Sequence, residues 1–233
     1  MAEKFYRTDR KEKSMRTQLK RFERQAEKSR DLAEGMLKLA FFDVDLKNSE
    51  LVFKQETFDE KSFADIFEVK SGNWTVEDGW AVGKNPNMCP GMIVSKENFF
   101  GNVMVEITAE MVAPSTHDIN VMINGEWDEE KDERGMAYVA GVEAFWHGQV
   151  GFEKSPEYKL TAATPLFTFD PTEQHNFKMG SVEGKVFVLV DDELCLEIQD
   201  PDPLNVNRYG KIGFEAYSSW WKFQGLKVYK MKY

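Results

Sequence analysis

Alternation of apolar and polar residues predicts β-strands in much of the chain beyond residue 50. In Val103–Met111 the residues at odd positions are apolar, whereas Glu106, Thr108 and Glu110 are polar. Asp118–Asn124 repeats this pattern, with apolar residues at positions 119, 121 and 123. Side chains alternate between the two faces of a strand, so each segment has one face suited to a core.

A hairpin and a final pair of strands are predicted near the C-terminus. The hairpin joins Lys185–Val190 to Leu194–Ile198, with Leu196 and Cys195 on opposite faces. Lys211–Tyr217 and Phe223–Tyr229 are predicted to form a closing pair. Short strands separated by Gly, Pro, Asn and Asp, without βαβ alternation, favour a β-sandwich or jelly roll over a Rossmann or TIM-barrel fold.

Residues 1–40 differ in composition from the rest of the chain, because they contain no Pro and one Gly. Residues of a weakly apolar seam recur every three or four positions: Met15, Leu19, Phe22, Ala26, Ser29, Ala33, Met36 and Ala40. This spacing predicts a helix of roughly 30 residues. The seam holds Ala and Ser where a strong coiled coil has Leu or Ile, so we expect the helix to pack on its own domain, a second copy or a partner subunit. The alternative, a membrane-surface helix, is disfavoured by its interleaved acidic residues.

We therefore assign residues 1–45 to an N-terminal helical arm and 46–233 to a β-sandwich domain. The net charge of −10 divides near this boundary: residues 1–35 hold 11 Lys/Arg against 7 Asp/Glu, and the remainder 19 against 33. Such a split suggests attraction between arm and body, within or between chains. An acidic chain of this kind is unsuited to bulk electrostatic binding of nucleic acid.

Several features favour a cytoplasmic protein without a membrane partner. No run of about 18 apolar residues is present, and the charged N-terminus lacks the apolar centre of a signal peptide. Cys89 and Cys195 show no CxxC or Cys/His spacing, so we expect two reduced, semi-buried thiols. GxSxG, Walker A, GxGxxG and HExxH motifs are absent.

Three segments, in this order, resemble the concanavalin A-like lectin/glucanase superfamily. They are Gly72–Gly83; His175–Met179 continuing to Val186–Asp191; and Gly210–Phe214 with Phe223–Val228. Within that superfamily the chain is most similar to bacterial 3-keto-disaccharide hydrolase-like domains and to an uncharacterised relative from pectin-utilisation clusters. The resemblance covers roughly residues 66–229. It implies a mainly β jelly roll of two antiparallel sheets, and hydrolysis or elimination at a glycosidic bond.

The segment Gly141–Gln149 carries the predicted catalytic residues. Glu143 and His147 alternate onto one strand face, where a carboxyl group and an imidazole suit acid and base roles. Trp146 is predicted to stack on a sugar ring. The alternative is that His147 belongs to a turn and Trp146 to the core.

Further residues are predicted to bind substrate. Asn120 and Asn124, together with Glu106, supply amide and carboxylate groups that pair with sugar hydroxyls. A solvated sheet face is the alternative for all three. In Trp220-Trp221 the outward ring is predicted to be a sugar platform or a contact for the N-terminal helix.

The segment Glu126–Glu130 contains the Glu-x-Asp-x-Glu pattern of retaining laminarinase-like enzymes, which belong to the superfamily that the chain resembles. The intervening Trp127 and Glu129, and the charged residues that follow, favour a solvated acidic loop instead. No cofactor is predicted, and a divalent cation such as calcium is the alternative for this loop.

The leading hypothesis is a carbohydrate-active protein that binds and cleaves a small glycoside or oligosaccharide, with a 3-keto sugar among the substrates that the resemblance implies. Two alternatives stay open: a non-catalytic carbohydrate-binding module, and an assembly subunit of a glycoside-processing complex. For the assembly subunit, we expect the N-terminal helix to bind a second copy of the chain, as a homo-oligomer, or a partner subunit.

Overall fold

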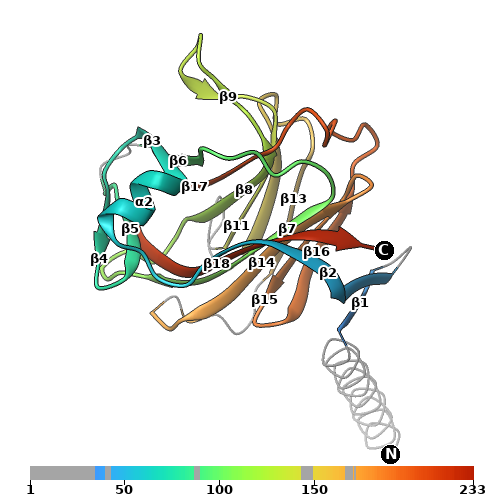
Figure 1. Ribbon diagram of the computed structural model, residues 1–233, viewed down its shortest axis with the longest axis horizontal. Helices are drawn as coiled ribbons and strands as arrows, with labels where there is room; N and C mark the ends of the chain where they lie inside the picture. Colours follow the sequence, from blue (N-terminus) through green and yellow to red (C-terminus); the bar gives the residue numbers. More distant parts are fainter. Residues whose placement is uncertain (1–34, 40–42, 87–89, 143–148, 166–169, 171) are drawn as a thin grey trace, which may run out of the picture. The chain divides into compact units, whose positions relative to one another are not determined.

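The computed structural model describes residues 35–39, 43–86, 90–142, 149–165, 170 and 172–233 (Figure 1). The chain divides into two compact units, residues 1–48 with Tyr233 and residues 49–232. In the first unit, β1 (Met36–Lys38) pairs antiparallel with the start of β2 (Asp43–Gln55).

The predicted N-terminal helix falls mainly on residues 1–34, which lie outside the described residues. Its predicted last turn is wrong, because Met36 lies in β1 opposite Asp45 of β2. Gly35, immediately before β1, has a φ of 84°, a conformation that suits a glycine.

The second unit consists of strands and one short helix. In chain order its further elements are α2 (Glu60–Ile66), β3 (Phe67–Ser71), β4 (Trp74–Glu77), β5 (Trp80–Lys84), β6 (Pro90–Ser95), β7 (Val103–Met111), β8 (Ile119–Gly125), β9 (Trp127–Asp128), β10 (Glu133–Arg134), β11 (Ala137–Val142), β12 (Gln149–Ser155), β13 (Thr161–Pro165), β14 (His175–Val182), β15 (Lys185–Val190), β16 (Glu193–Gln199), β17 (Lys211–Tyr217) and β18 (Trp220–Lys232).

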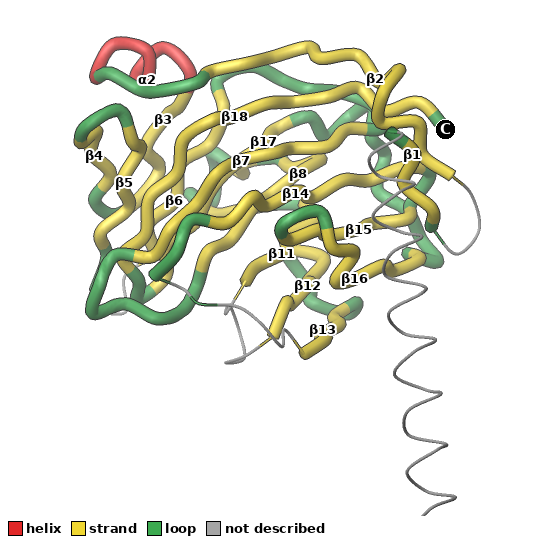
Figure 2. Tube along the Cα trace, turned by 90° about the horizontal axis from the view of Figure 1, so that it is seen from below, coloured by secondary structure: helices red, strands yellow, loops and turns green. Residues whose placement is uncertain are grey.

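Apart from the two-stranded β9–β10 pair, these strands form two antiparallel sheets, which we call the β7 sheet and the β8 sheet. The β7 sheet has the order β18-β7-β14-β15-β16, and β5, paired with β4, also joins β18. The β8 sheet has the order β13-β12-β11-β8-β17-β6-β3. Figure 2 shows the strands of the β7 sheet running side by side. The predicted mainly β sandwich of two antiparallel sheets is confirmed.

The core lies between the two sheets, as the alternation predicts. Val105 and Ile107 of β7 are fully buried, and so are Val121 and Ile123 of β8; all four belong to one apolar cluster. The opposite face of β7 carries the half-buried polar residues of the pattern. Each sheet therefore has an inner face in the core and an outer face turned away from it.

The predicted C-terminal hairpin forms from β15 and β16, with Asp191 and Asp192 at positive φ in the turn. The predicted separation of Cys195 from Leu196 is wrong, because both side chains pack against the core cluster. A register shift between Val188 and Leu189 interrupts the strict alternation near Cys195.

The predicted closing pair is also wrong as a pair. β17 lies in the β8 sheet between β8 and β6, whereas β18 lies in the β7 sheet next to β7. Ser218, with a φ of 52°, lies in the short connection by which the chain crosses from one sheet to the other.

Helix α2 begins at a capping box. Asp59 accepts a hydrogen bond from the Ser62 amide, and the Ser62 hydroxyl accepts one from the Asp59 amide. Phe63 on this helix is buried, and its ring lies 5.6 Å from that of Phe67 at the start of β3. The cap therefore fixes a helix that packs on the aromatic end of the core.

We expect Asp59→Ala to lower the melting temperature by about 3 °C, because the first turn of α2 loses its cap. Thermal unfolding followed by circular dichroism measures this shift. Lys61→Ala, at an exposed position on the same helix, is the matched control. Equal melting temperatures for the two variants contradict a role of the cap.

Candidate functional site

Three predicted site residues, Glu143, Trp146 and His147, lie outside the described residues. Their catalytic and stacking roles stay predictions. They belong to the segment that joins β11 to β12 in the β8 sheet.

Glu106 and Asn120 do not share a face. Glu106 lies on the outer face of the β7 sheet and Asn120 in the β8 sheet, so the predicted common polar surface is wrong. The Glu106 carboxylate accepts hydrogen bonds from Lys227 at 3.0 Å, Asn176 at 3.2 Å and Tyr229 at 3.3 Å. Three protein donors thus already occupy this carboxylate.

Trp220 and Asn124 also lie apart from Asn120. Trp220 begins β18 in the β7 sheet, and the Lys84 ammonium lies 3.8 Å from the centre of its ring. Asn124 is fully buried with a φ of 43°, and its amide nitrogen donates to the Gly101 carbonyl at 3.0 Å. Asn124 is therefore engaged with the Gly101 backbone at the end of β8, whereas Asn120 lies opposite Glu215 of β17.

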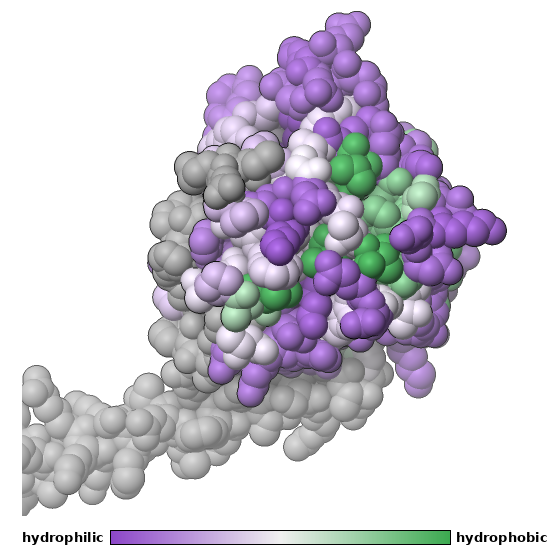
Figure 3. Space-filling view, turned by 90° about the vertical axis from the view of Figure 1, so that its left-hand side faces the viewer, coloured by the Kyte–Doolittle hydropathy of each residue, from purple (hydrophilic) through white to green (hydrophobic). Residues whose placement is uncertain are grey.

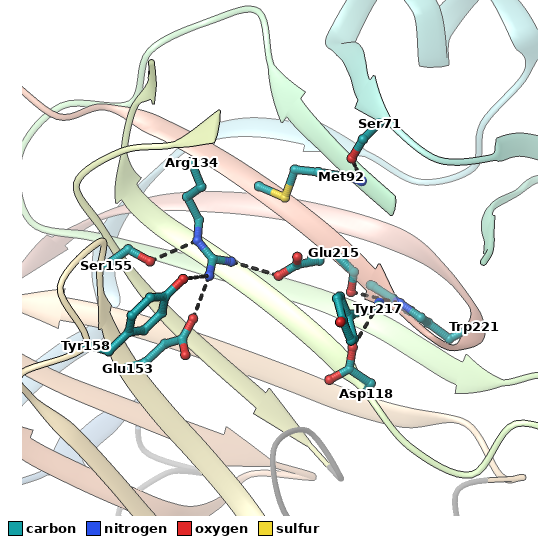
Figure 4. A network of polar contacts seen from close by, with 10 residues as sticks. All are labelled: Ser71, Met92, Asp118, Arg134, Glu153, Ser155, Tyr158, Glu215, Tyr217 and Trp221. Carbon is teal, nitrogen blue, oxygen red and sulfur yellow. Dashed lines mark hydrogen bonds and ion pairs between the residues drawn. The ribbon is translucent and has the colours of Figure 1, made fainter. Parts of the chain in front are cut away.

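Polar side chains from β10, β12 and β17 converge on this outer face around one guanidinium group (Figure 4). Arg134 donates to Glu153 at 2.6 Å, to Glu215 at 2.7 Å and to Ser155 at 2.9 Å. The Tyr158 hydroxyl lies 3.4 Å from the same guanidinium. We call these five residues the Arg134 cluster.

Strand alternation places the acids of this cluster. In β12, Phe152 points into the core, so Glu153 points outward; in β17, Phe214 and Glu215 have the same relation. The Trp221 indole nitrogen donates to the Glu215 carbonyl at 3.2 Å and fixes the backbone there.

The cluster is poorly accessible to water. The exposed fractions of the side chains are 13% for Arg134, 9% for Glu153 and 18% for Glu215. Charges in such a setting interact more strongly than at the surface, and each needs its partner.

A second polar group continues the same face toward the start of β8. Asp118 is buried, and its carboxylate accepts hydrogen bonds from the Tyr217 amide at 2.9 Å and from the Asn120 side chain. The Asn120 oxygen Oδ1 is buried and has no hydrogen-bond partner within the described part of the chain. Asn120 lies opposite Glu215 on β17, which connects this group to the Arg134 cluster.

Burial raises the pKa of Asp118 to about 7; the Asn120 hydrogen bond opposes this and the charges of Glu215 and Glu153 reinforce it. Burial likewise raises the pKa of Glu153 to about 7, against the attraction of Arg134. Burial acts to lower the pKa of Arg134, but Glu215 and Glu153 outweigh it, so the guanidinium stays charged. Two carboxyl groups on one face therefore titrate near neutral pH.

Glycines lie beside Asn120 on this face. Asn120 is opposite Gly141 of β11, which is opposite Gly151 of β12. Neither glycine has a side chain, so the backbone itself lines the sheet surface next to the Asn120 amide. A ligand can approach such a floor more closely than an ordinary sheet face.

Sequence reasoning missed Arg134, Glu153, Glu215 and Asp118. For Glu153 a signal exists, because Val150 and Phe152 alternate with polar or small residues along β12. For Arg134 no local signal exists, since it ends a run of charged residues typical of a solvated loop.

The acidic segment after β8 is a short hairpin of β9 and β10, which projects from the second unit in Figure 1. The Asp128 carboxylate accepts the amides of Glu130 and Lys131 in its turn and forms an ion pair with Lys131 at 3.1 Å. Figure 3 shows hydrophilic atoms covering this projecting end. The preferred interpretation, a solvated acidic loop, holds for the exposed Glu129 and Glu130 in the turn, whereas residues 126–128 are half-buried and Trp127–Asp128 form a strand.

Among the residues described, no three His, Cys, Asp or Glu side chains lie together as a metal site. The predicted calcium alternative stays untested. No helix in the described part of the chain has the length and apolar character needed to span a bilayer.

No protein-family model and no curated protein matches the sequence. Solved structures match at low identity. A Bacillus subtilis protein of unknown function with a galectin-like fold has a TM-score of 0.64 at 12% identity, covering 78% of this chain and 96% of that one. The carbohydrate-binding module CBM66 from Bacillus subtilis has a TM-score of 0.55 at 15% identity, covering 70% and 94%.

The Bacillus licheniformis beta-glucanase has a TM-score of 0.56 at 11% identity, covering 79% of this chain and 99% of that one. Binding modules, lectin-like domains and glucanases thus share one architecture with this chain. The chain therefore has the concanavalin A-like jelly-roll fold that its three sequence segments predict.

Proposed function

We propose that the protein binds a small glycoside or oligosaccharide on the outer face of the β8 sheet, over the Arg134 cluster and Asn120. Structural neighbours that are named as a carbohydrate-binding module and a glucanase support this choice of ligand class. Fold likeness alone does not assign a function, so the proposal depends on the side chains of the face.

The observation that carries the proposal is the Asn120 oxygen, which no donor among the described residues reaches, beside Glu215 and the two glycines of β11 and β12. A buried amide oxygen without a donor is unfavourable, and a sugar hydroxyl is a donor of suitable size. The same hydroxyl also accepts hydrogen bonds, which Arg134 and the Tyr158 hydroxyl can donate at the rim of the site. Neighbouring donors and acceptors of this kind match the vicinal hydroxyl groups of a sugar.

We expect Asn120→Ala to weaken sugar binding at least tenfold, because the sugar hydroxyl loses the buried amide oxygen that accepts its hydrogen bond. Calorimetric titration against a glycoside panel, with 3-keto glycosides included, measures the affinity. Lys131→Gln, on the exposed turn of the β9–β10 hairpin, is the matched control and should bind as the wild type does. Wild-type affinity in Asn120→Ala overturns this placement, and a wild-type protein that binds no member of the panel overturns the function.

A second candidate function, cleavage of the bound glycoside, is favoured by the pKa of Glu153 near 7. A carboxyl group with this pKa is partly protonated at neutral pH and can donate its proton to the leaving oxygen. Water then replaces the leaving group, so that one glycosidic bond becomes two hydroxyl groups. The predicted Glu143 and His147 supply the partner acid or base in this scheme.

We expect Glu153→Gln to reduce product formation about 10²–10⁴-fold while the affinity for the glycoside changes little. Chromatography of the reaction products, beside calorimetry of the same variant, separates the two effects. Glu143→Gln tests the residue that the sequence predicts. If the wild type releases no product from any glycoside that it binds, the protein is a binding module.

A further inference from the structure

We propose that an open pocket beside Trp127 binds the carboxylate of an acidic sugar, so that the ligand class is an acidic rather than a neutral oligosaccharide. This inference rests on the proposed carbohydrate binding on the β8 sheet and names its substrate class. Residues from β3, β6, β9 and β17, with the loop before β17, line the pocket: among them Lys70, Val94, Trp127, Arg208 and Lys211.

Three hydrogen-bond donors in this pocket have no acidic acceptor within the described part of the chain. The Trp127 indole nitrogen is buried and has no hydrogen-bond partner among the residues described. The Lys211 ammonium donates one of its three N–H bonds to the Lys96 carbonyl at 2.8 Å, so two N–H bonds can still be donated to a ligand. The Arg208 guanidinium lies over the Tyr209 ring at 5.2 Å, and no carboxylate of the described residues pairs with it. A ligand that matches these groups is an acceptor, and two of the three favour an anion.

The carboxylates that line the pocket have other partners. Glu68 and Glu129 share the Lys70 ammonium, at 2.9 and 2.7 Å. The Glu126 carboxylate accepts the Met136 amide at 3.4 Å within the hairpin connection. Among the residues that the structure describes, the pocket cations without an ion-paired carboxylate are therefore Arg208 and Lys211. Burial is the main cause that lowers the pKa of Lys211; the charge of Glu68, and less so that of Glu129, opposes this, whereas Lys70 adds to it.

The pocket shares the β9–β10 hairpin with the Arg134 cluster, because Trp127 lines the pocket and Arg134 lies on the other strand of that hairpin. Trp127 lies directly opposite Arg134 in the β9–β10 pair, so both side chains are on one face of the hairpin. Trp127 packs against an apolar cluster of the β8 sheet that includes Val94 and Met92, and Met92 is opposite Glu215. Cross-strand neighbours lie about 5 Å apart, a distance that one or two sugar rings span. One chain of sugars can therefore reach both places.

The test compares paired oligosaccharides, each ending in a uronic acid or in its carboxyl-reduced neutral counterpart. We expect the full-length protein to bind the acidic member of a pair at least tenfold more tightly, with an advantage that shrinks as salt rises. The double variant R208Q/K211Q should lose this advantage and keep the affinity for the neutral member. Lys131→Gln on the same hairpin removes an exposed charge and is the matched control.

The outcomes separate the two proposals. Equal affinity for both members of every pair overturns the acidic-ligand inference and leaves carbohydrate binding intact. The acidic-ligand inference is likewise overturned if R208Q/K211Q keeps the full preference while its melting temperature equals that of the wild type. If no oligosaccharide of either kind binds, the proposed function and this inference both fall.

Discussion

Replacing Arg134 by methionine is expected to lower the free energy of unfolding by about 3–5 kcal/mol at pH 8, because the buried Glu153 and the half-buried Glu215 lose their common cation. Methionine keeps much of the aliphatic volume, so packing changes little. At pH 5 the loss should be smaller. Glu153 already has a raised pKa, and without Arg134 it takes up a proton more readily. Urea unfolding at the two pH values measures both effects.

Two further variants show whether charge is the cause. Lys131→Met breaks an exposed ion pair on the same hairpin and should leave stability unchanged, because surface pairs contribute little. The triple variant R134M/E153Q/E215Q removes the uncompensated charges and should recover part of the loss. If R134M is as stable as K131M, the Arg134 cluster is not a buried electrostatic network.

The fold could be predicted because its signal is local. Strict alternation over Val103–Met111 and Ile119–Ile123 reports which side chains face the core, and the structure confirms these faces. Alternation carries no information about which strands pair. For that reason the sequence favours pairing of β17 with β18, which are adjacent along the chain, although they lie in different sheets.

The candidate site is harder to predict, since long-range contacts assemble it. Arg134 and Glu215 are 81 residues apart and meet only because the hairpin folds back over β17. Asn120 can be identified from its place on a polar strand face, which is a local property. Glu106 has the same local pattern, yet it lies on the outer face of the other sheet. Sequence periodicity therefore finds faces, and only the fold determines which faces form one site.

Stability is expected to fall as the pH rises from 5 to 8, and Asp118 is expected to contribute the largest single part. Its pKa is about 7 in the folded protein and near 3.8 in the unfolded chain, so the folded state holds the proton more tightly. The contribution is complete below pH 4 and is lost as the pH passes 7. A shift of this size corresponds to at most about 4 kcal/mol. Carboxylates with lowered pKa, such as Asp128, act with the opposite sign but below pH 5.

The variant Asp118→Asn isolates this proton. Its side chain can still accept the Tyr217 amide, but it does not ionise, so its stability should depend less on pH between 5 and 8. We measure the melting temperatures of the wild type and the variant across this pH range and take their difference at each pH. The contributions of all other titrating groups cancel in that difference. We expect the melting temperature of the variant, relative to that of the wild type, to rise by up to about 10 °C between pH 5 and pH 8. Glu157 is an exposed carboxylate with a lowered pKa, so the melting temperature of Glu157→Gln should change with pH above 6 in the same way as that of the wild type. If the melting temperature of Asp118→Asn also changes with pH in parallel with that of the wild type, Asp118 is already ionised at pH 5. That outcome removes this carboxyl group from the proton chemistry of the site.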